Sequence, residues 1–306
     1  MARLVIALVN SMPGEAQRQT EQQFGGILAA TGRDVELRFY SLDAERPPHY
    51  QDSAALRGAP PDGLIVTGMP PRAASLADEP YWPKLTELVD FAVDAGVPSV
   101  WSCLAAHAAV LYLDGIERQR LPRKLSAVVD CTQSRGDDPA MAGLPAHWRM
   151  PHSRYNDLPE AVLAARGYRI LSRIDAGGAD IFAKTEGAPL LFCQGHPEYD
   201  ADTLLREYRR DVRQFLMGER EAYPMIPENC FGAEVAARLE NFREQALRER
   251  RAGLLEAFPM AACAKDVRHT WRDVAVGLYA NWLGMLADWK HGAAPARVAR
   301  QAVPVA

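Results

Sequence analysis

Long apolar runs and paired cysteines are both missing from this 306-residue chain. No apolar run approaches the ~20 residues that a membrane-spanning helix needs. The 5 cysteines are odd in number and widely spaced, without a Cys-x-x-Cys pair. This spacing argues against a disulfide framework or a zinc site and favours reduced thiols in the cytoplasm. Residues 1–10 lack a small-residue cleavage site and fit a buried strand better than a signal peptide.

Signatures of phosphate loops, metal sites and nucleic-acid binding are also absent. Gly25-Gly26 belongs to neither a Gly-x-Gly-x-x-Gly nor a Walker pattern, and no His-x-x-x-His pair occurs. We therefore expect no resident cofactor and no metal. The formal net charge of -4 provides no positive field that would recruit nucleic acid. We expect small-molecule partners, without nucleic acid or membrane; a homodimer is compatible with these observations.

The order of apolar segments predicts an α/β fold. Residues 4–9 form a continuous apolar run, which is typical of a buried parallel strand. Further strands are expected at 35–40, 63–67, 97–102, 169–174, 181–183 and 190–193. Helices are expected at 20–31, 81–94, 104–113 and 201–217, and the pattern is helical from 227 to about 289. This alternation predicts a doubly wound, mostly parallel sheet flanked by helices, with a helical carboxyl-terminal region. We expect one domain over residues 1–290 and a disordered tail over 291–306.

Cys103 lies where a predicted strand runs directly into a predicted helix. Such a corner is typical of a nucleophile elbow, which exposes the side chain at the carboxyl edge of the sheet. The helix amino terminus favours a thiolate there, and its free N–H groups suit a developing oxyanion. A buried cysteine that acts as a small hydrophobe is the plainer alternative, and the spacing leaves both open.

His196 and Glu198 follow another predicted strand, at the edge of the sheet where Cys103 is expected. A histidine and a cysteine after different strands can meet in space although they are distant in sequence. Glu198 is two residues from His196 and could fix the tautomer of the imidazole, as the third member of a catalytic triad does. Most loop histidines carry no chemistry, so the pair gains weight only together with Cys103.

Two polar segments are candidate substrate sites. In Pro151-His-Ser-Arg-Tyr155, Arg154 could hold a carboxylate in a two-pronged contact, although a surface loop with a helix cap at Ser153 is the plainer interpretation. In Glu207-Tyr-Arg-Arg-Asp211, one arginine could face a site. A solvated helix face accounts for the same charges.

In this order the segments resemble the homoserine O-succinyltransferase family, which includes homoserine O-acetyltransferases. The resemblance extends over about residues 4–285 and is carried by Asn10-Ser-Met-Pro13, Gly63-Leu-Ile-Val-Thr-Gly68-x-Pro70, Cys103-x-x-Ala106, Lys124-Leu125, Pro151-His-Ser-Arg-Tyr155, Gly195-His-Pro-Glu-Tyr-Asp200, Glu207-Tyr-x-Arg210-Asp211 and Ile226-Pro-x-Asn229. The Pro-His-Ser-Arg-Tyr and Gly-His-Pro-Glu-Tyr-Asp segments are the most specific of these.

The resemblance implies a fold like that of class I glutamine amidotransferases and a role in methionine biosynthesis. It implies a ping-pong reaction in which Cys103 takes an acyl group from coenzyme A, a co-substrate, and passes it to the hydroxyl of homoserine or a similar amino acid. His196 would be the base and Glu198 its partner. Arg210 would hold the acceptor carboxylate, Ser153 and Arg154 would line the acceptor pocket, and Lys124 would lie near the donor.

The chain departs from the family pattern at several positions. The lysine expected two residues after Met12-Pro13, which helps to build the oxyanion site, is missing, and Arg18 is a candidate substitute. Leu104-Ala105 replaces a Trp-Gly pair, and Cys230 replaces an aromatic residue. The position that selects the donor is Arg72, whose cation would favour a succinyl over an acetyl group.

Two alternatives remain open from the residues. A glutamine-hydrolysing amidotransferase would use the same cysteine and His-x-Glu pair, but such modules usually serve a synthetase partner. A non-catalytic binding or regulatory relative would explain the missing lysine. It would not explain why Cys103, His196 and Glu198 are all present.

Overall fold

The computed structural model describes residues 3–292. Most of the predicted tail, residues 293–306, therefore lies outside the described residues. The domain prediction for residues 1–290 stays a prediction. No helix within the described range is both long enough and apolar enough to cross a membrane.

One ten-stranded sheet, in the order β3-β2-β1-β4-β5-β10-β9-β8-β6-β7, organises the described part of the chain. Its strands are β1 (Leu4–Val9), β2 (Val35–Ser41), β3 (Gln51–Asp52), β4 (Gly63–Val66), β5 (Ser99–Ser102), β6 (Gln119–Gln133), β7 (His147–Asp157), β8 (Arg169–Ile174), β9 (Ala179–Glu186) and β10 (Ala188–Cys193). Neighbours from β3 to β10 pair in parallel, and those from β10 to β7 pair antiparallel. The α/β prediction is confirmed.

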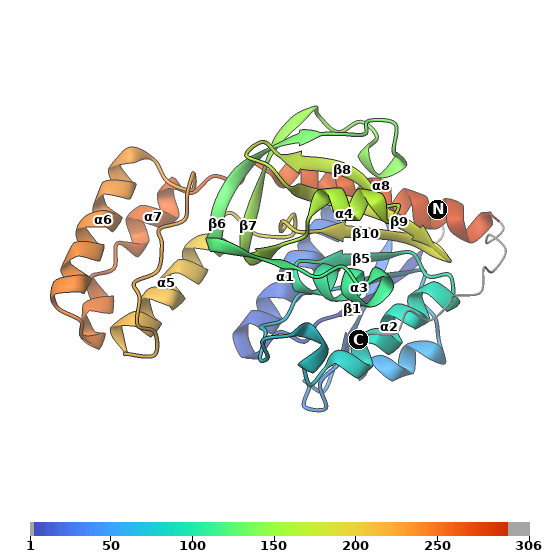
Figure 1. Ribbon diagram of the computed structural model, residues 1–306, viewed down its shortest axis with the longest axis horizontal. Coiled ribbons are helices and arrows are strands. Elements are labelled where there is room, and N and C mark those ends of the chain that lie inside the picture. Colours follow the sequence, from blue (N-terminus) through green and yellow to red (C-terminus); the bar gives the residue numbers. More distant parts are fainter. Residues whose placement is uncertain (1–2, 293–306) are drawn as a thin grey trace.

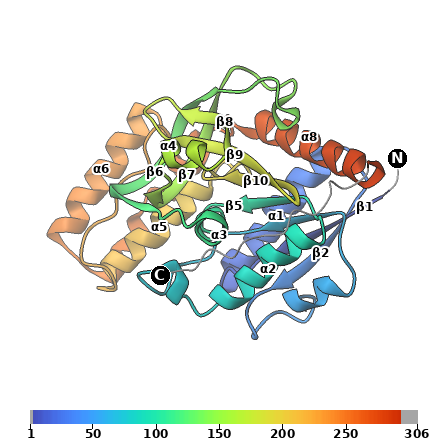
Figure 2. The same ribbon diagram turned by 45° about the vertical axis from the view of Figure 1, so that its right-hand side comes forward.

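Helices cover both faces of the sheet (Figures 1 and 2). The α-helices are α1 (Gly14–Ala30), α2 (Trp82–Asp94), α3 (Leu104–Asp114), α4 (Glu160–Ala165), α5 (Thr203–Leu216), α6 (Ala233–Arg248), α7 (Met260–Asp266) and α8 (Arg272–His291). Short 3₁₀ turns are η1 (Ser53–Arg57), η2 (Leu76–Asp78), η3 (Pro139–Met141) and η4 (Ala252–Ala257). One apolar core joins α2 and α3 to the sheet, and a second joins α1 and α8 to its other face.

Helices α5, α6 and α7 pack around a third apolar cluster of their own, with Leu205, Val212, Leu239 and Phe258 among its buried members. In Figure 1 this group lies at the left end of the molecule, beside β6 and β7. Because α5 is the part of the group nearest these strands, its polar face can meet theirs. This junction bears on the site described below.

Strands β6 and β7 are the elements that the pattern of apolar runs does not predict. β6 is polar and largely exposed along its first half, and β7 contains the Pro151-His-Ser-Arg-Tyr155 segment. Their pairing with each other is what makes them strands, and such long-range pairing leaves little trace in local hydropathy. The interpretation of Pro151–Tyr155 as a surface loop is therefore wrong. The first helix also begins earlier than predicted, at Gly14. Residues 14–19 are helical but mostly polar, so they show no apolar periodicity that would mark them as helix.

The parallel strands end at one edge of the sheet. Cys193 at the end of β10 lies beside Ser102 at the end of β5, and Val66 of β4 pairs with Trp101. Polar segments after these strands are consequently gathered together, as is usual for ligand sites in open α/β sheets.

Candidate active site

Cys103 occupies the sharp corner between β5 and α3. Its backbone angles, φ 50° and ψ -113°, lie in a region that L-residues rarely adopt. The corner is held by a 2.7 Å hydrogen bond from the Cys103 N–H to the Cys193 carbonyl and by the first helical bond, from the His107 N–H to the Cys103 carbonyl. The strand-to-helix elbow expected from the sequence is therefore present.

Gly68, after β4, leaves space around the start of α3. A Cβ added at Gly68 would lie 3.2 Å from the Leu104 nitrogen and 3.5 Å from the Cys103 Cβ. Leu104 is the first residue of α3, so its N–H has no partner within the helix and is available for an oxyanion. Arg18, the candidate substitute for the missing lysine, is 70% exposed, pairs with Glu15 and is outside the cavity lining.

His196 is buried beside Cys103 and is oriented by Glu198. Its Nδ1 lies 2.8 Å from the Glu198 Oε1, which also accepts a 3.3 Å hydrogen bond from the Ser102 hydroxyl. The Tyr199 ring stacks on the imidazole at 4.1 Å between ring centroids. Burial opposes protonation of His196. The adjacent Cys103 and Glu198 outweigh burial through charge and hydrogen bonding, and they raise the pKa of His196 well above its usual value.

All eight residues predicted for the site line one cavity of about 940 Å³. They are Cys103, His196, Glu198, Arg210, Ser153, Arg154, Lys124 and Arg72. They come from six separate segments of the chain, so their convergence depends on the tertiary fold.

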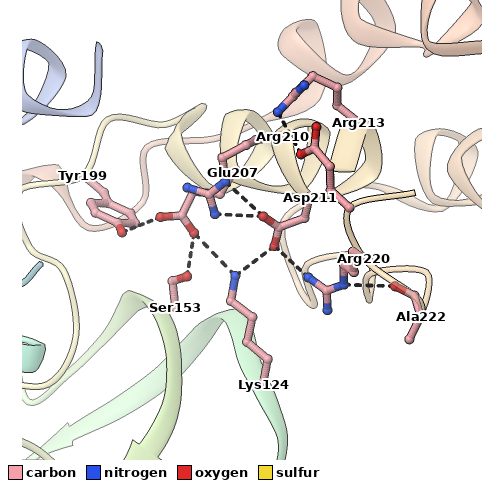
Figure 3. A network of polar contacts seen from close by, with 10 residues as sticks. Lys124, Ser153, Tyr199, Glu207, Arg210, Asp211, Arg213, Arg220 and Ala222 are labelled. Carbon is pink, nitrogen blue, oxygen red and sulfur yellow. Dashed lines mark hydrogen bonds and ion pairs between the residues drawn. The ribbon is translucent and has the colours of Figure 1, made fainter. Parts of the chain in front are cut away.

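A charged network closes one side of the cavity, between β6, β7 and α5 (Figure 3). The Glu207 carboxylate accepts hydrogen bonds from the Ser153 hydroxyl at 2.5 Å and the Tyr199 hydroxyl at 2.7 Å. Lys124 Nζ lies 3.9 Å from Glu207 and 3.3 Å from Asp211. Arg210 donates to Asp211 Oδ1 through Nε and Nη2. Burial lowers the pKa of the Arg210 guanidinium, but the neighbouring carboxylates outweigh it and the net pKa is raised.

Arg154 lines the cavity, but much of its guanidinium is committed to the protein. Nε donates to His152 Nδ1 at 3.2 Å, and Nη1 donates to the Asn156 carbonyl and pairs with Asp157 at 3.0 Å. Its contribution to a carboxylate site is thus limited to the remaining Nη2.

Behind Arg154, Cys131, His152 and Asp180 form a buried cluster whose potential ligand atoms lie within 4.8 Å of one another. Because His152 Nδ1 accepts from Arg154, the ring proton is on Nε2, which faces Asp180 Oδ1 at 3.2 Å. Burial, with Asp180 adding to it, raises the pKa of the Cys131 thiol. A protonated Nε2 and a neutral thiol do not suit a metal ion. The cluster instead fits a buried polar support for Arg154, with His152 and Asp180 in contact at 3.2 Å.

Several cavity residues were not predicted from the sequence. Glu207 and Tyr199 fall within segments that drew attention for other residues, while Arg118 and His107 lie outside any candidate pattern. Their roles depend on which side chains face the cavity after folding. Of these residues, His107 alone had a local signal in the sequence, because it lies one helical turn after Cys103.

Comparisons with known proteins point to one family. The family model described as homoserine O-succinyltransferase matches residues 1–290. The chain is 47% identical over 295 residues to the homoserine O-succinyltransferase of Methylorubrum extorquens, covering 94% of this chain and 88% of the relative. It is 44% identical to that of Rhodopseudomonas palustris, covering 94% and 90%.

A solved structure supports the fold prediction. The glutamine amidotransferase of Methylobacillus flagellatus has a similar fold, with a TM-score of 0.54 and 19% sequence identity, covering 92% of this chain and 94% of that one. The expected class I glutamine amidotransferase-like architecture is confirmed. On the family match and the identities with its members, the chain belongs to the homoserine O-succinyltransferase family.

Proposed function

We propose that the chain transfers a succinyl group from succinyl-coenzyme A to the hydroxyl of homoserine or a similar amino acid through a thioester on Cys103. The observation that carries this proposal is the arrangement of Cys103, His196 and Glu198 at the elbow, in a cavity with separate charged walls. The relatives named homoserine O-succinyltransferase support the choice of acceptor and donor.

In the first half-reaction the Cys103 thiolate attacks the thioester carbonyl. The oxyanion forms near the Leu104 N–H, in the space that Gly68 leaves open. When the tetrahedral intermediate collapses, the bond to the coenzyme A sulfur breaks and His196 donates its proton to that sulfur. The products of this step are free coenzyme A and an acyl thioester on Cys103.

In the second half-reaction the acceptor hydroxyl attacks the thioester. His196, now neutral, takes the hydroxyl proton, and the Cys103 thiolate is the leaving group. The resulting imidazolium and thiolate restore the starting state. Glu198 acts through His196 by holding Nδ1, which leaves Nε2 toward the reacting atoms.

The network in Figure 3 suits the zwitterionic end of an amino acid. The Arg210 guanidinium, with Nε and Nη2 on Asp211, keeps Nη1 for a carboxylate, and its side chain is 51% exposed. Glu207 supplies a carboxylate for an ammonium group. Ser153 and Tyr199 orient that carboxylate, and Lys124 balances its charge toward the donor side. A cation and an anion on the same wall favour an amino acid over a simple alcohol.

The expected donor preference is supported by Arg72, which the segment from Gly68 to Ser75 contributes to the cavity lining. A cation there favours the free carboxylate of a succinyl group over an acetyl group, because only the former gains an ion pair.

Two activities compete with this proposal. Glutamine hydrolysis would use the same elbow and imidazole, and a non-catalytic relative would use the cavity for binding alone. A direct test supplies the protein with succinyl-coenzyme A, with and without homoserine, and separately with glutamine. Coenzyme A release that depends on homoserine is expected, without ammonia from glutamine. Ammonia release without coenzyme A release would establish the amidotransferase, and the absence of both would indicate a binding protein.

A further inference from the structure

An arginine outside the predicted site residues, Arg118, lines the cavity and forms no ion pair among the described residues. Arg118 follows α3, and its Nη1 is buried with no hydrogen-bond partner among the described residues. Its Nη2 donates a long 3.5 Å hydrogen bond to the Ala74 carbonyl. By contrast, Arg72 is an exposed residue of the same cavity lining. A buried N–H without a hydrogen-bond partner is costly, and a small movement of this half-buried side chain would let a ligand in the cavity satisfy it.

The surroundings of Arg118 contain further unsatisfied polar atoms. Glu79 Oε1 accepts the N–H groups of Arg72 and Ala73 at 2.8 and 2.9 Å, which fixes the wall segment, while its Oε2 and the Tyr81 hydroxyl are buried without partners. Burial raises the pKa of Tyr81, so its phenol keeps its proton and can donate to an anion. Burial lowers the pKa of Arg118, although Tyr81 and Glu79 oppose the change.

Arg118 also lies within electrostatic reach of the helix that begins at the nucleophile. His107, one turn into α3, is buried and has its pKa lowered to about 4, first by burial and then by the charges of Arg154 and Arg118. Both His107 and Arg118 line the cavity with Cys103. Arg118 therefore shares the lining of the cavity into which the acyl chain of a Cys103 thioester would extend.

We propose that Arg118 binds the distal carboxylate of a dicarboxylic acyl group on Cys103 and thereby selects the donor. This inference rests on the proposed acyl transfer and adds the residue that determines donor specificity. Arg72, being exposed, has the lesser role.

The chemistry of the donor distinguishes this carboxylate from the phosphates of coenzyme A. Two methylene groups separate the succinyl carboxylate from the thioester carbonyl. The phosphates lie beyond the whole pantetheine arm. A cation near the helix that carries the nucleophile is placed for the acyl end, and the exposed Arg120, which also lines the cavity, is better placed for phosphates.

The test compares two donors of equal chain length, succinyl-coenzyme A and butyryl-coenzyme A, which differ in one carboxylate. The rate of acylation of Cys103 is measured for each by intact-mass spectrometry, without acceptor, on the native protein, Arg118→Gln and Arg118→Lys. Arg123→Gln is the matched control, because Arg123 is exposed, pairs with Glu228 and does not line the cavity.

Native protein is expected to favour succinyl. Arg118→Gln should lower the succinyl rate on the order of 10- to 100-fold with little change for butyryl, Arg118→Lys should retain part of the preference, and Arg123→Gln should retain all of it. An equal loss for both donors would overturn the inference, because it would indicate phosphate binding or a role in holding the wall segment. An unchanged preference would also overturn it. If native protein accepts neither acyl group, the proposed function itself fails; acylation by both donors at equal rates defeats only the role of Arg118.

Discussion

Cys103, whose backbone φ is positive, is oriented by contacts on both sides of the β5–α3 corner. The bond to the Cys193 carbonyl ties it to β10, and Gly68 allows the segment after β4 to approach the first N–H of α3. Strain at a catalytic corner persists only where surrounding contacts determine it. Small changes around this residue should therefore affect chemistry more than stability.

Gly68→Ala tests the space left for the oxyanion. The added methyl group would lie 3.2 Å from the Leu104 nitrogen, where it obstructs the expected oxyanion. We expect kcat for acyl transfer to fall on the order of 10²-fold, the size of effect seen when an oxyanion donor is lost, with thermal stability nearly unchanged. Steady-state kinetics and a thermal melt provide the measurements. Full activity in the variant would exclude Leu104 as the donor.

Glu198→Gln tests the support of His196. Glu198 is one of the groups that raise the pKa of His196, so its neutral replacement should lower that pKa. His196 must be protonated to release coenzyme A. The alkaline limb of kcat/KM for the donor should therefore move to lower pH, and the rate should drop on the order of 10²- to 10⁴-fold. A pH–rate profile of unchanged shape and position would show that Glu198 does not act through the imidazole.

Arg210→Ala tests the acceptor wall. Loss of this guanidinium should raise the KM for homoserine at least tenfold while the KM for the acyl donor changes little, because only the acceptor carboxylate uses it. Arg213→Ala is the matched control. It changes an arginine of the same helix that pairs with Glu219 and lies outside the cavity. Equal effects on the two substrates would refute the assignment.

The sequence revealed those site residues whose signal is local. Cys103 lies at a strand-to-helix transition, and His196 and Glu198 are adjacent after a strand, so periodicity and spacing suffice to select them. Arg118 could not be found this way, because the proposal for it rests on its place in the cavity lining and on an Nη1 that folding leaves without a hydrogen-bond partner. The contacts of Arg154 with His152 and Asp157 could not be predicted either, because they too form only in the folded chain.

At the scale of elements, strands β7 and β9 of the antiparallel half of the sheet support the loop that carries His196. The His196 N–H donates to the Pro151 carbonyl of β7, and Gly195 packs directly against side chains of β7 and β9. The parallel half was predictable, because buried parallel strands are continuous apolar runs. β6 and β7 were not, because their faces toward the site are polar and their strand character comes from pairing with each other.

Gly195→Ala tests this support. A Cβ at Gly195 would lie 2.6 Å from Met150 Cγ and 2.8 Å from both Asp180 Oδ1 and His152 Nε2, which are buried and cannot easily move. We expect a loss of about 1–3 kcal/mol in the free energy of unfolding, with a displaced His196 and reduced kcat. Urea denaturation and kinetics would measure the two effects. A variant with native stability and rate would show that the strands do not constrain the loop.

At the scale of the whole molecule, buried neutral histidines make stability depend on pH. Burial lowers the pKa of His107 from 6.5 to about 4 and also lowers that of His152. Below pH 6.5 the unfolded chain binds protons that the folded chain excludes. The stability contributed by these groups is therefore present above pH 6.5 and is lost as pH falls toward their folded values.

His107→Gln should reduce this dependence. At pH 5 the variant should recover on the order of 2 kcal/mol of the stability that the native protein loses between pH 7 and pH 5, since each pKa unit corresponds to about 1.4 kcal/mol. Urea denaturation at both pH values measures the difference. His147→Gln, at an exposed position, is the control. Identical pH dependence in native protein and His107→Gln would contradict the assignment.

The covalent step is the central claim, and the mass of the protein after incubation with succinyl-coenzyme A tests it most directly. A gain equal to one succinyl group, located on Cys103 by peptide mapping and lost on addition of homoserine, is the predicted result, and Cys103→Ala should show no gain. Transfer to homoserine by the Cys103→Ala variant, or an acyl group mapped to another residue, would contradict the account.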